Sequence, residues 1–268
     1  MNSAGAKARI LAITSGKGGV GKTFIAANLA AALAKRGRRV LVLDADLGLA
    51  NLDVILNLYP KATLHDVLTG KCSIEEVMLE APGGFWVLPA ASGLVEYSRL
   101  TSDVQDELRR IVDDLSRRYD YLLLDTGAGI SDLVLYTASL AEEVLVIATP
   151  EPASLADAYA TIKVLALMQQ RTSLKLVFNQ ARSEAEGRKL AEQLQSVVDR
   201  FVNAQVEKSV KLDYLGLIPG DAAVRDAARK RQLLFVREPR APASIALAAL
   251  AQLLDAPAPA AVLRGSAR

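Results

Sequence analysis

The residues with the clearest chemistry are consecutive ones, Gly16-Lys17-Gly18-Gly19-Val20-Gly21-Lys22-Thr23. They fit the pattern G-x-x-x-x-G-K-[ST], in which glycines let backbone N–H groups converge on phosphate oxygens without Cβ clashes. Lys22 can reach the β- and γ-phosphates of a nucleotide, and the Thr23 hydroxyl can bind Mg²⁺. A helix that begins here adds its free amides and its dipole. The segment therefore predicts a nucleotide site that uses Mg²⁺.

A second pattern fits the same glycines. Gly16, Gly18 and Gly21 also satisfy G-x-G-x-x-G, and Asp44 follows at about the spacing of a dinucleotide-binding fingerprint. Two features decide against that interpretation. The Lys-Thr pair directly after the last glycine has no role in it, and Asp125 supplies a second strand-terminal carboxylate, as a Walker B segment does. A glycine turn without any ligand is the least favoured explanation.

These residues need elements that bring strand ends together. Continuously apolar runs, typical of strands buried on both faces of a parallel sheet, occur at 10–14, 40–44, 86–89, 121–125, 144–149, 174–179 and 215–219. Helical patterns lie between them, at 23–36, 103–118, 154–170 and 184–206, and Gly37 suits a left-handed cap after the first. The order predicts an α/β fold: a doubly wound, mostly parallel sheet with helices on both faces.

Ligands of such a sheet bind beyond the carboxyl ends of the strands. Polar or turn residues close five of the predicted runs there: Asp44, Asp125, Thr149, Asn179 and Pro219. The Gly-rich loop also follows the first run, so the predicted topology gathers all of them at one edge of the sheet.

The composition is that of an ordinary globular protein. The chain has 268 residues, 51% of them hydrophobic, which suits one large domain over residues 1–255. Residues 256–268 are rich in Pro and Ala and are expected to be disordered. The net charge of +2 makes no strong claim on nucleic acid or membrane. No signal peptide or bilayer-spanning run is found, so we expect a cytoplasmic protein.

Lys17 is not required for cradling phosphate, and it carries a resemblance. The pattern K-G-G-V-G-K-T resembles the deviant Walker A motif of the MinD/ParA ATPases, and residues 44–53 and 125–129 resemble that family's switch I and switch II. Shorter matches resemble its FlhG/FleN branch in particular: 89–93, 149–152, 157–159, 162–163, 186–188, 199–201, and 215–219 followed by 223–225. The resemblance covers about residues 8–255.

The resemblance implies roles for these residues. In the family, the extra lysine reaches across an ATP-sandwich dimer to the partner's nucleotide, which gives Lys17 that role, and Asp157 matches the acidic position that meets it. Asp44 and Asp46 are the pair expected to position the attacking water and the metal, with Asp46 favoured for the water. Asp125 is expected to hold a metal-bound water. ATP hydrolysis is expected to be slow in isolation, because charge stabilisation requires a second subunit.

The base can be argued from one segment. Asn179-Gln180-Ala181-Arg182 has Arg where the N-K-x-D motif of GTPases has the carboxylate that reads guanine. Asn179 can still bond an adenine amino group, as in the family it resembles, and the loop at Pro219 and Gly220 can close over the base. We therefore expect ATP/ADP with Mg²⁺ as the ligands.

The FlhG/FleN resemblance implies control of flagellar number and placement, through a flagellar transcription activator or a flagellar GTPase of the signal-recognition type. No Asp-Gln-Ala element appears in residues 1–9, which favours the activator. A MinD-like division-site ATPase and a ParA-like DNA-partitioning ATPase are the alternatives. Residues 242–254 predict a helix without Lys or Arg, which favours core packing over peripheral attachment to the inner membrane. No specific nucleic-acid partner is expected.

Overall fold

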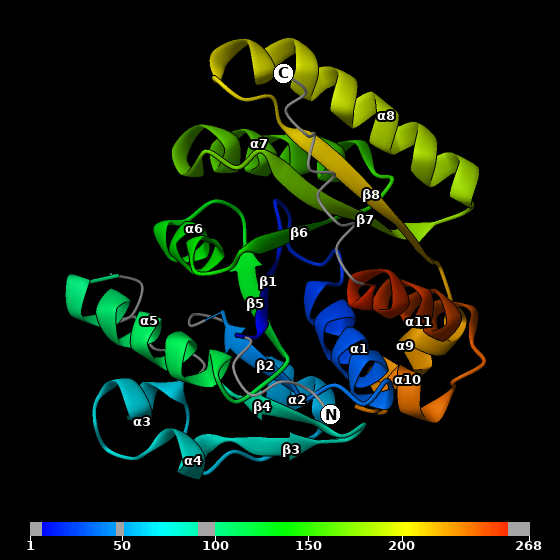
Figure 1. Cartoon of the computed structure of the whole chain (residues 1–268). Coiled ribbons are helices and arrows are strands. Elements are labelled where there is room, and N and C mark those ends of the chain that lie inside the picture. Colours follow the sequence, from blue (N-terminus) through cyan, green and yellow to red (C-terminus); the bar gives the residue numbers. More distant parts are fainter. Residues whose placement is uncertain (1–6, 47–50, 91–99, 257–268) are drawn as a thin grey trace, which may run out of the picture.

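The computed structural model describes residues 7–46, 51–90 and 100–256, and Figure 1 shows their arrangement. Its centre is one eight-stranded sheet. The strands are β1 Arg9–Ser15, β2 Val40–Ala45, β3 Leu79–Ala81, β4 Phe85–Leu88, β5 Tyr121–Ala128, β6 Glu143–Ala148, β7 Ser173–Ala181 and β8 Lys211–Pro219. They lie in the order β3-β4-β2-β5-β1-β6-β7-β8, and every pair is parallel except β3 with β4.

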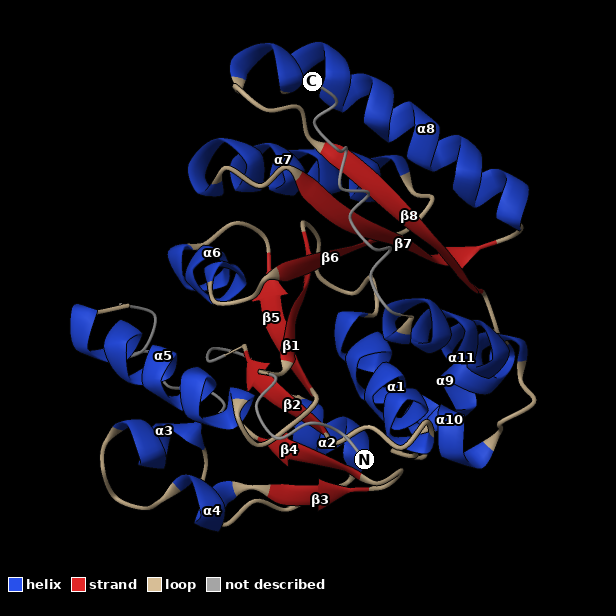
Figure 2. Ribbon diagram, viewed as in Figure 1, coloured by secondary structure: helices blue, strands red, loops and turns tan. Residues whose placement is uncertain are grey.

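Helices cover both faces of this sheet (Figure 2). They are α1 Lys22–Lys35, α2 Leu52–Leu56, α3 Leu64–Leu68, α4 Ile74–Val77, α5 Ser102–Ser116, α6 Asp132–Ser139, α7 Pro152–Gln169, α8 Glu184–Phe201, α9 Ala222–Arg229, α10 Leu234–Arg237 and α11 Pro242–Asp255, with a short 3₁₀ turn at Asn203–Gln205. One hydrophobic core includes residues of α3 and α5 to α8, and the other includes residues of α1, α10 and α11. The doubly wound α/β prediction is confirmed.

The strands alternate between the two cores. In β1, Ile10 and Ala12 belong to one core, and Leu11 and Ile13 belong to the other. A strand covered on both faces has no polar side, which is why the sequence shows continuous apolar runs instead of alternation.

Three expectations from the sequence were wrong in detail. The short antiparallel β3 was not predicted. The last strand begins at Lys211, and most of its residues are only partly buried, because β8 lies at the edge of the sheet. The helix expected at 184–206 ends at Phe201. Gly37 has φ +83°, so the predicted left-handed cap is confirmed.

Parts of the predicted segments lie outside the described residues: 47–50 of the switch I segment, 91–93 of a family-like stretch, and 257–268 of the tail. Within the described part of the chain, no helix combines the length and the apolar character needed to cross a bilayer.

Candidate nucleotide site

The predicted phosphate loop connects β1 to α1 at the centre of the sheet. Its last glycine, Gly21, is the residue before α1 and has φ 95°, a left-handed conformation that favours glycine. Among the described residues, no side chain caps this helix end, and the first turn contains no acidic residue. The first amides of α1 therefore suit a phosphate group.

The two lysines of the loop lie in different surroundings. Lys22 is 9% exposed, and burial lowers its pKa while the charges of Asp125 and Asp46 act in the opposite direction. Lys17 lies at the surface, where its Nζ is 2.9 Å from Oε2 of Glu151, and this hydrogen bond raises its pKa. Only Lys22 is thus placed inside its own phosphate site.

Gly16 packs against the backbone of α7. A Cβ added at Gly16 would lie 2.1 Å from the carbonyl oxygen of Asp157. Any side chain at this position would push the loop away from α7. Gly16 is therefore needed for a close approach of two backbones, and the contact places Asp157 beside the loop that carries Lys17.

Asn179, at the end of β7, holds the loop from the other side. Its Nδ2 donates a hydrogen bond to the carbonyl oxygen of Val20 at 2.7 Å, and its Oδ1 accepts from the N–H of Gln180 at 3.0 Å. A Cβ at Gly21 would lie 2.4 Å from Nδ2. The amide therefore supports the phosphate loop in this structure, and its contact with adenine stays a prediction.

The three aspartates meet at the ends of β2 and β5. Asp44 and Asp125 are partners in the register of these strands, and both are 2% exposed. Burial raises the pKa of each carboxyl, and the charge of Asp125 adds to the effect on Asp44. Asp46 lies over β5, since a Cβ at Gly127 would be 3.5 Å from its carboxyl carbon. The topology thus brings together the acidic residues that the sequence predicted.

The structure separates the surroundings of Asp44 from those of Asp46. Asp44 Oδ1 accepts from the N–H of Asp46 at 3.1 Å, and Oδ2 accepts from the N–H of Leu52 at 3.3 Å. The Asp44 carboxylate therefore bonds to the backbone both at Asp46 and at Leu52. Asp46, in contrast, is only partly buried. A carboxylate whose two oxygens both accept backbone hydrogen bonds, as in Asp44, is better suited to positioning the chain than to direct contact with a reacting water.

The donor set fits Mg²⁺. Oδ1 of Asp125 is buried and has no hydrogen-bond partner among the described residues, while the Thr23 hydroxyl bonds to this side chain and lowers its pKa. A hydroxyl and one or two carboxylates are typical of Mg²⁺ sites that complete their coordination with water and phosphate. Within the described residues, no cluster of three or more His, Cys, Asp or Glu side chains forms a metal cage.

Two contributors were missed at the sequence level. Glu151 was quoted only as part of a family-like stretch, although it holds Lys17. Ser15 donates from Oγ to the carbonyl oxygen of Lys17 at 2.7 Å, which fixes the start of the loop. Neither contact has a sequence signal, because each joins residues through a turn or a distant helix. Pro219 is the last residue of β8 and Gly220 follows it, as expected, and their contact with the base stays a prediction.

Comparison with known proteins agrees with this geometry. A family model described as ParA, NUBPL iron-transfer P-loop NTPase, matches residues 6–255. The antiactivator FleN of Pseudomonas aeruginosa is 45% identical over 253 residues, which cover 94% of this chain and 88% of that protein. The flagellum site-determining protein YlxH of Helicobacter pylori is 36% identical over 84% of this chain and 74% of its own length.

A solved structure gives the same fold with a bound ligand. The septum site-determining protein MinD of Pyrococcus horikoshii, complexed with Mg-ADP, has a TM-score of 0.72 and 28% identity, covering 92% of this chain and 96% of that one. Both the sequence matches and the fold match span nearly the whole described chain. The chain therefore belongs to the MinD/ParA family of P-loop NTPases, and within that family it is similar to the FleN/FlhG flagellar regulators.

Proposed function

We propose that the chain is a regulatory switch that binds ATP, hydrolyses it slowly, and forms a homodimer while ATP is bound. The switch controls flagellar number and placement. The observation that carries the proposal is the loop with two lysines at different depths, in a chain 45% identical to a protein named antiactivator FleN. One lysine serves the chain's own phosphate site, and the other is presented at the surface.

Within one subunit the roles follow from burial and position. Lys22 and the first amides of α1 would offset phosphate charge, and the Thr23 hydroxyl would hold Mg²⁺, with Asp125 holding it through a water. When bound, Mg²⁺ would neutralise charge that develops on the phosphates. Asp46 positions the attacking water, and Asp44 holds Asp46 in place by accepting its backbone N–H.

Lys17 works in trans in this proposal. In the single subunit it is paired with Glu151, and Asp157 lies close enough for its charge to raise the Lys17 pKa further. An ion pair at the surface contributes little to stability because solvent and salt screen it, so it opposes release of the lysine only weakly. Lys17 can therefore exchange Glu151 for the nucleotide of a second subunit and supply the charge that speeds hydrolysis.

The nucleotide is ATP in preference to GTP. Asn179 is fixed beside the loop by its bonds to Val20 and Gln180, at the end of a strand where a base would lie. Arg182 replaces the carboxylate that reads guanine. Pro219 ends the neighbouring strand and Gly220 follows it, and from there both can close over adenine.

The proposed partner is a flagellar transcription activator, since the similar protein FleN is named an antiactivator. A flagellar GTPase of the signal-recognition type is the second candidate, supported by the flagellar name of YlxH. The protein acts in the cytoplasm, and peripheral attachment at the inner membrane is the less favoured location.

Size-exclusion chromatography with ATP and Mg²⁺ tests the switch. Asp46→Ala is expected to bind ATP and accumulate as a dimer, because hydrolysis no longer releases it. Lys22→Ala is the matched control and is expected to bind no nucleotide and stay monomeric. An Asp46→Ala protein that binds ATP but remains a monomer would refute the dimer switch.

A pull-down from a flagellated host, with and without ATP, separates the function classes. Recovery of a flagellar activator or GTPase supports the flagellar role. Recovery of septum proteins, with binding to vesicles, would favour the MinD-like alternative. Salt-sensitive binding of nonspecific DNA that requires ATP would favour the ParA-like alternative.

A further inference from the structure

The helix α11 is largely apolar around its circumference. From Pro242 to Leu254 it contains no charged residue, and its polar residues there are Ser244 and Gln252. Its inner side is buried against the core and includes Ala243, Leu247, Leu250, Ala251 and Leu254. Its outer side is exposed, with Ile245 at 59% and Leu253 at 56%. A helix that is hydrophobic on nearly every side is normally buried on every side, so we expect another molecule or segment to pack on the outer side of α11.

The outer side has the spacing of a helix-contact stripe. Its exposed residues are Ile245, Ala248, Ala249, Gln252 and Leu253, which follow i, i+3, i+4, i+7 and i+8. We call this set the α11 face. Two alanines lie in its middle, and a large apolar side chain stands at each end. Small central residues let the backbone of a second helix approach closely.

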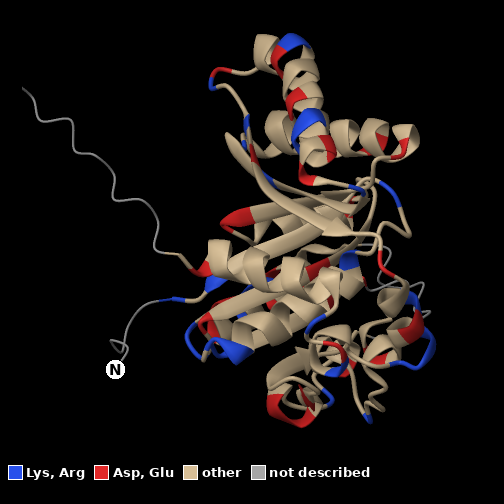
Figure 3. Ribbon diagram, turned by 90° about the vertical axis from the view of Figure 1, so that its right-hand side faces the viewer, with Lys and Arg blue, Asp and Glu red and all other residues tan. Residues whose placement is uncertain are grey.

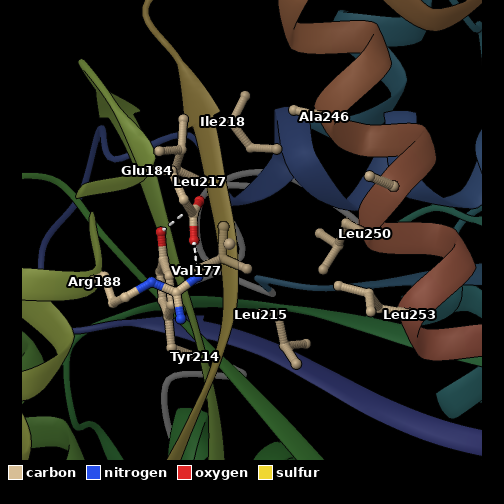
Figure 4. Close-up of a pocket in the computed structure, with 12 residues that line it drawn as sticks. Val177, Glu184, Arg188, Tyr214, Leu215, Leu217, Ile218, Ala246, Leu250 and Leu253 are labelled. Carbon is tan, nitrogen blue, oxygen red and sulfur yellow. Dashed lines mark hydrogen bonds and ion pairs between the residues drawn. The ribbon is translucent and has the colours of Figure 1, made fainter. Parts of the chain in front are cut away.

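A hollow lies on each side of the α11 face. One, of about 490 Å³, lies toward α1 and α10 and is lined by Ala32, Phe235 and Pro239 besides residues of α11. The other, of about 320 Å³, lies toward β8, and Figure 4 shows Leu250 and Leu253 of α11 across from Leu215 of that strand. A ridge between two grooves is the surface into which the side-chain rows of another helix fit.

The surroundings of the larger hollow are basic. Lys35 and Arg36 line it. Lys35 has its Nζ 5.6 Å from the centre of the Phe235 ring and has no ion-pair partner among the described residues. The segment 225–240, which includes α10, contains six basic and two acidic residues: Arg225, Arg229, Lys230, Arg231, Arg237 and Arg240 against Asp226 and Glu238. Figure 3 views the molecule from this side, where the ribbon of α11 carries no charge colour until its end.

We propose that the α11 face binds an amphipathic α-helix of a partner protein, with its apolar stripe on α11 and acidic residues beside Lys35. The inference rests on the proposed function, in which the partner is a flagellar transcription activator. It adds the surface and the chemistry of the contact, away from the nucleotide site.

Other occupants fit less well. A second copy would bring a second Lys35 to the interface, and Asp255 could not pair with it because it is already bound by Arg36 and Arg38. The chain's own residues 257–268 contain two arginines and no acidic residue, so they do not complement a basic rim. A flat bilayer surface does not fill two hollows. An acidic helix satisfies both the shape and the charge.

The test measures binding of the purified full-length chain to the purified activator, with ATP and Mg²⁺. Ala248→Arg places a long charged side chain in the middle of the α11 face and is expected to weaken binding at least about tenfold. Val197→Arg on α8 is the matched control, since Val197 is an exposed apolar residue elsewhere, and it is expected to bind like wild type. Both variants are expected to keep wild-type ATP binding. Lys35→Glu is expected to weaken binding of the activator. Hydrogen-exchange measurements on the complex should show protection of an activator helix that carries acidic residues.

The outcomes separate this inference from the proposed function. If wild type binds the activator and Ala248→Arg binds equally well, the α11 face is not the contact and the inference fails while the function stands. If wild type does not bind the activator, the inference fails together with the activator as the proposed partner, and the flagellar role would then depend on the GTPase. Two further results would overturn the inference: loss of binding to phosphatidylethanolamine–phosphatidylglycerol vesicles in Ala248→Arg, which points to a membrane, or loss of a nucleotide-independent dimer, which points to a second copy.

Discussion

At the scale of single residues, the buried carboxyl pair dominates the electrostatics of the nucleotide site. Asp44 and Asp125 sit opposite each other on neighbouring strands, and burial raises the pKa of Asp44 to about 8 and that of Asp125 to about 7. Two backbone N–H groups lower the Asp44 pKa but do not cancel the burial. Without a cation, the fold therefore holds protons on this pair that the unfolded chain would release.

This pair makes stability depend on pH. A folded pKa above the unfolded value stabilises the fold below the ordinary carboxyl range, and that stabilisation is lost as pH rises through the folded value. The melting temperature of the nucleotide-free chain should therefore fall between pH 5 and pH 8. Asp44→Asn should flatten this slope, because one titrating group is removed. Asp132→Asn, at an exposed position, is the control, and an Asp44→Asn slope equal to wild type would contradict the assignment.

At the scale of helices and strands, Arg171 connects the start of β7 to the end of α6 and the start of β6. Arg171, between α7 and β7, donates to the carbonyl oxygens of Glu142 at 2.9 Å, Ala138 at 2.8 Å and Ala141 at 2.6 Å. These carbonyls belong to the last turn of α6 and to the segment that leads into β6, where a helix has fewer backbone donors for its last acceptors. The guanidinium thus closes α6 and fixes the entry to β6, the strand that precedes Glu151.

Removing that side chain should loosen this junction. Arg171→Ala removes the guanidinium donor from three carbonyls, and we expect a loss of roughly 2–4 kcal/mol in the free energy of unfolding, since hydrogen bonds from charged groups contribute about 1.5–3 kcal/mol each. Urea unfolding measures the change. Arg117→Ala, an exposed arginine at the end of α5, should cost no more than about 0.5 kcal/mol. Equal losses in the two variants would show that the Arg171 contacts contribute no net stability.

At the scale of the whole molecule, the phosphate loop and the α11 face serve different contacts. The loop lies at the carboxyl ends of the central strands, with Lys17 exposed beside Glu151. The α11 face lies on the outer side of the helical layer that covers one face of the sheet (Figure 1). In the proposed mechanism, the phosphate loop forms the dimer contact when ATP is bound, and the α11 face binds the regulated protein.

The separation of the two lysines predicts separable defects. Lys17→Ala should keep ATP affinity close to wild type, because Lys22 and the loop amides remain, but it should lose the ATP-dependent dimer. Its ATPase rate should fall at least about tenfold, since charge supplied in trans is removed. Light scattering and phosphate release measure the two effects, with Lys71→Ala, an exposed lysine, as the control. A Lys17→Ala protein that dimerises and hydrolyses ATP like wild type would remove the lysine from the mechanism.

The parallel sheet, the phosphate loop and the family could be predicted from the sequence alone. Runs buried on both faces read as apolar segments, and the phosphate loop is a contiguous motif whose glycines and lysines are visible without the fold. The family comparison agrees with that interpretation. What local patterns did not reveal were β3, the edge position of β8 and the end of α8, because strand order and helix ends depend on packing partners.

The contacts between distant segments became visible in the tertiary structure. Glu151 forms an ion pair with Lys17, Asn179 donates a hydrogen bond to Val20, and Asp44 accepts from the backbone at Asp46 and Leu52. It also showed that half of α11 faces solvent, although the sequence favoured a core-packing helix without specifying which side is covered. Side-chain burial and contacts between distant residues could not be predicted from local sequence patterns, because they depend on which strand ends and helix faces the topology brings together.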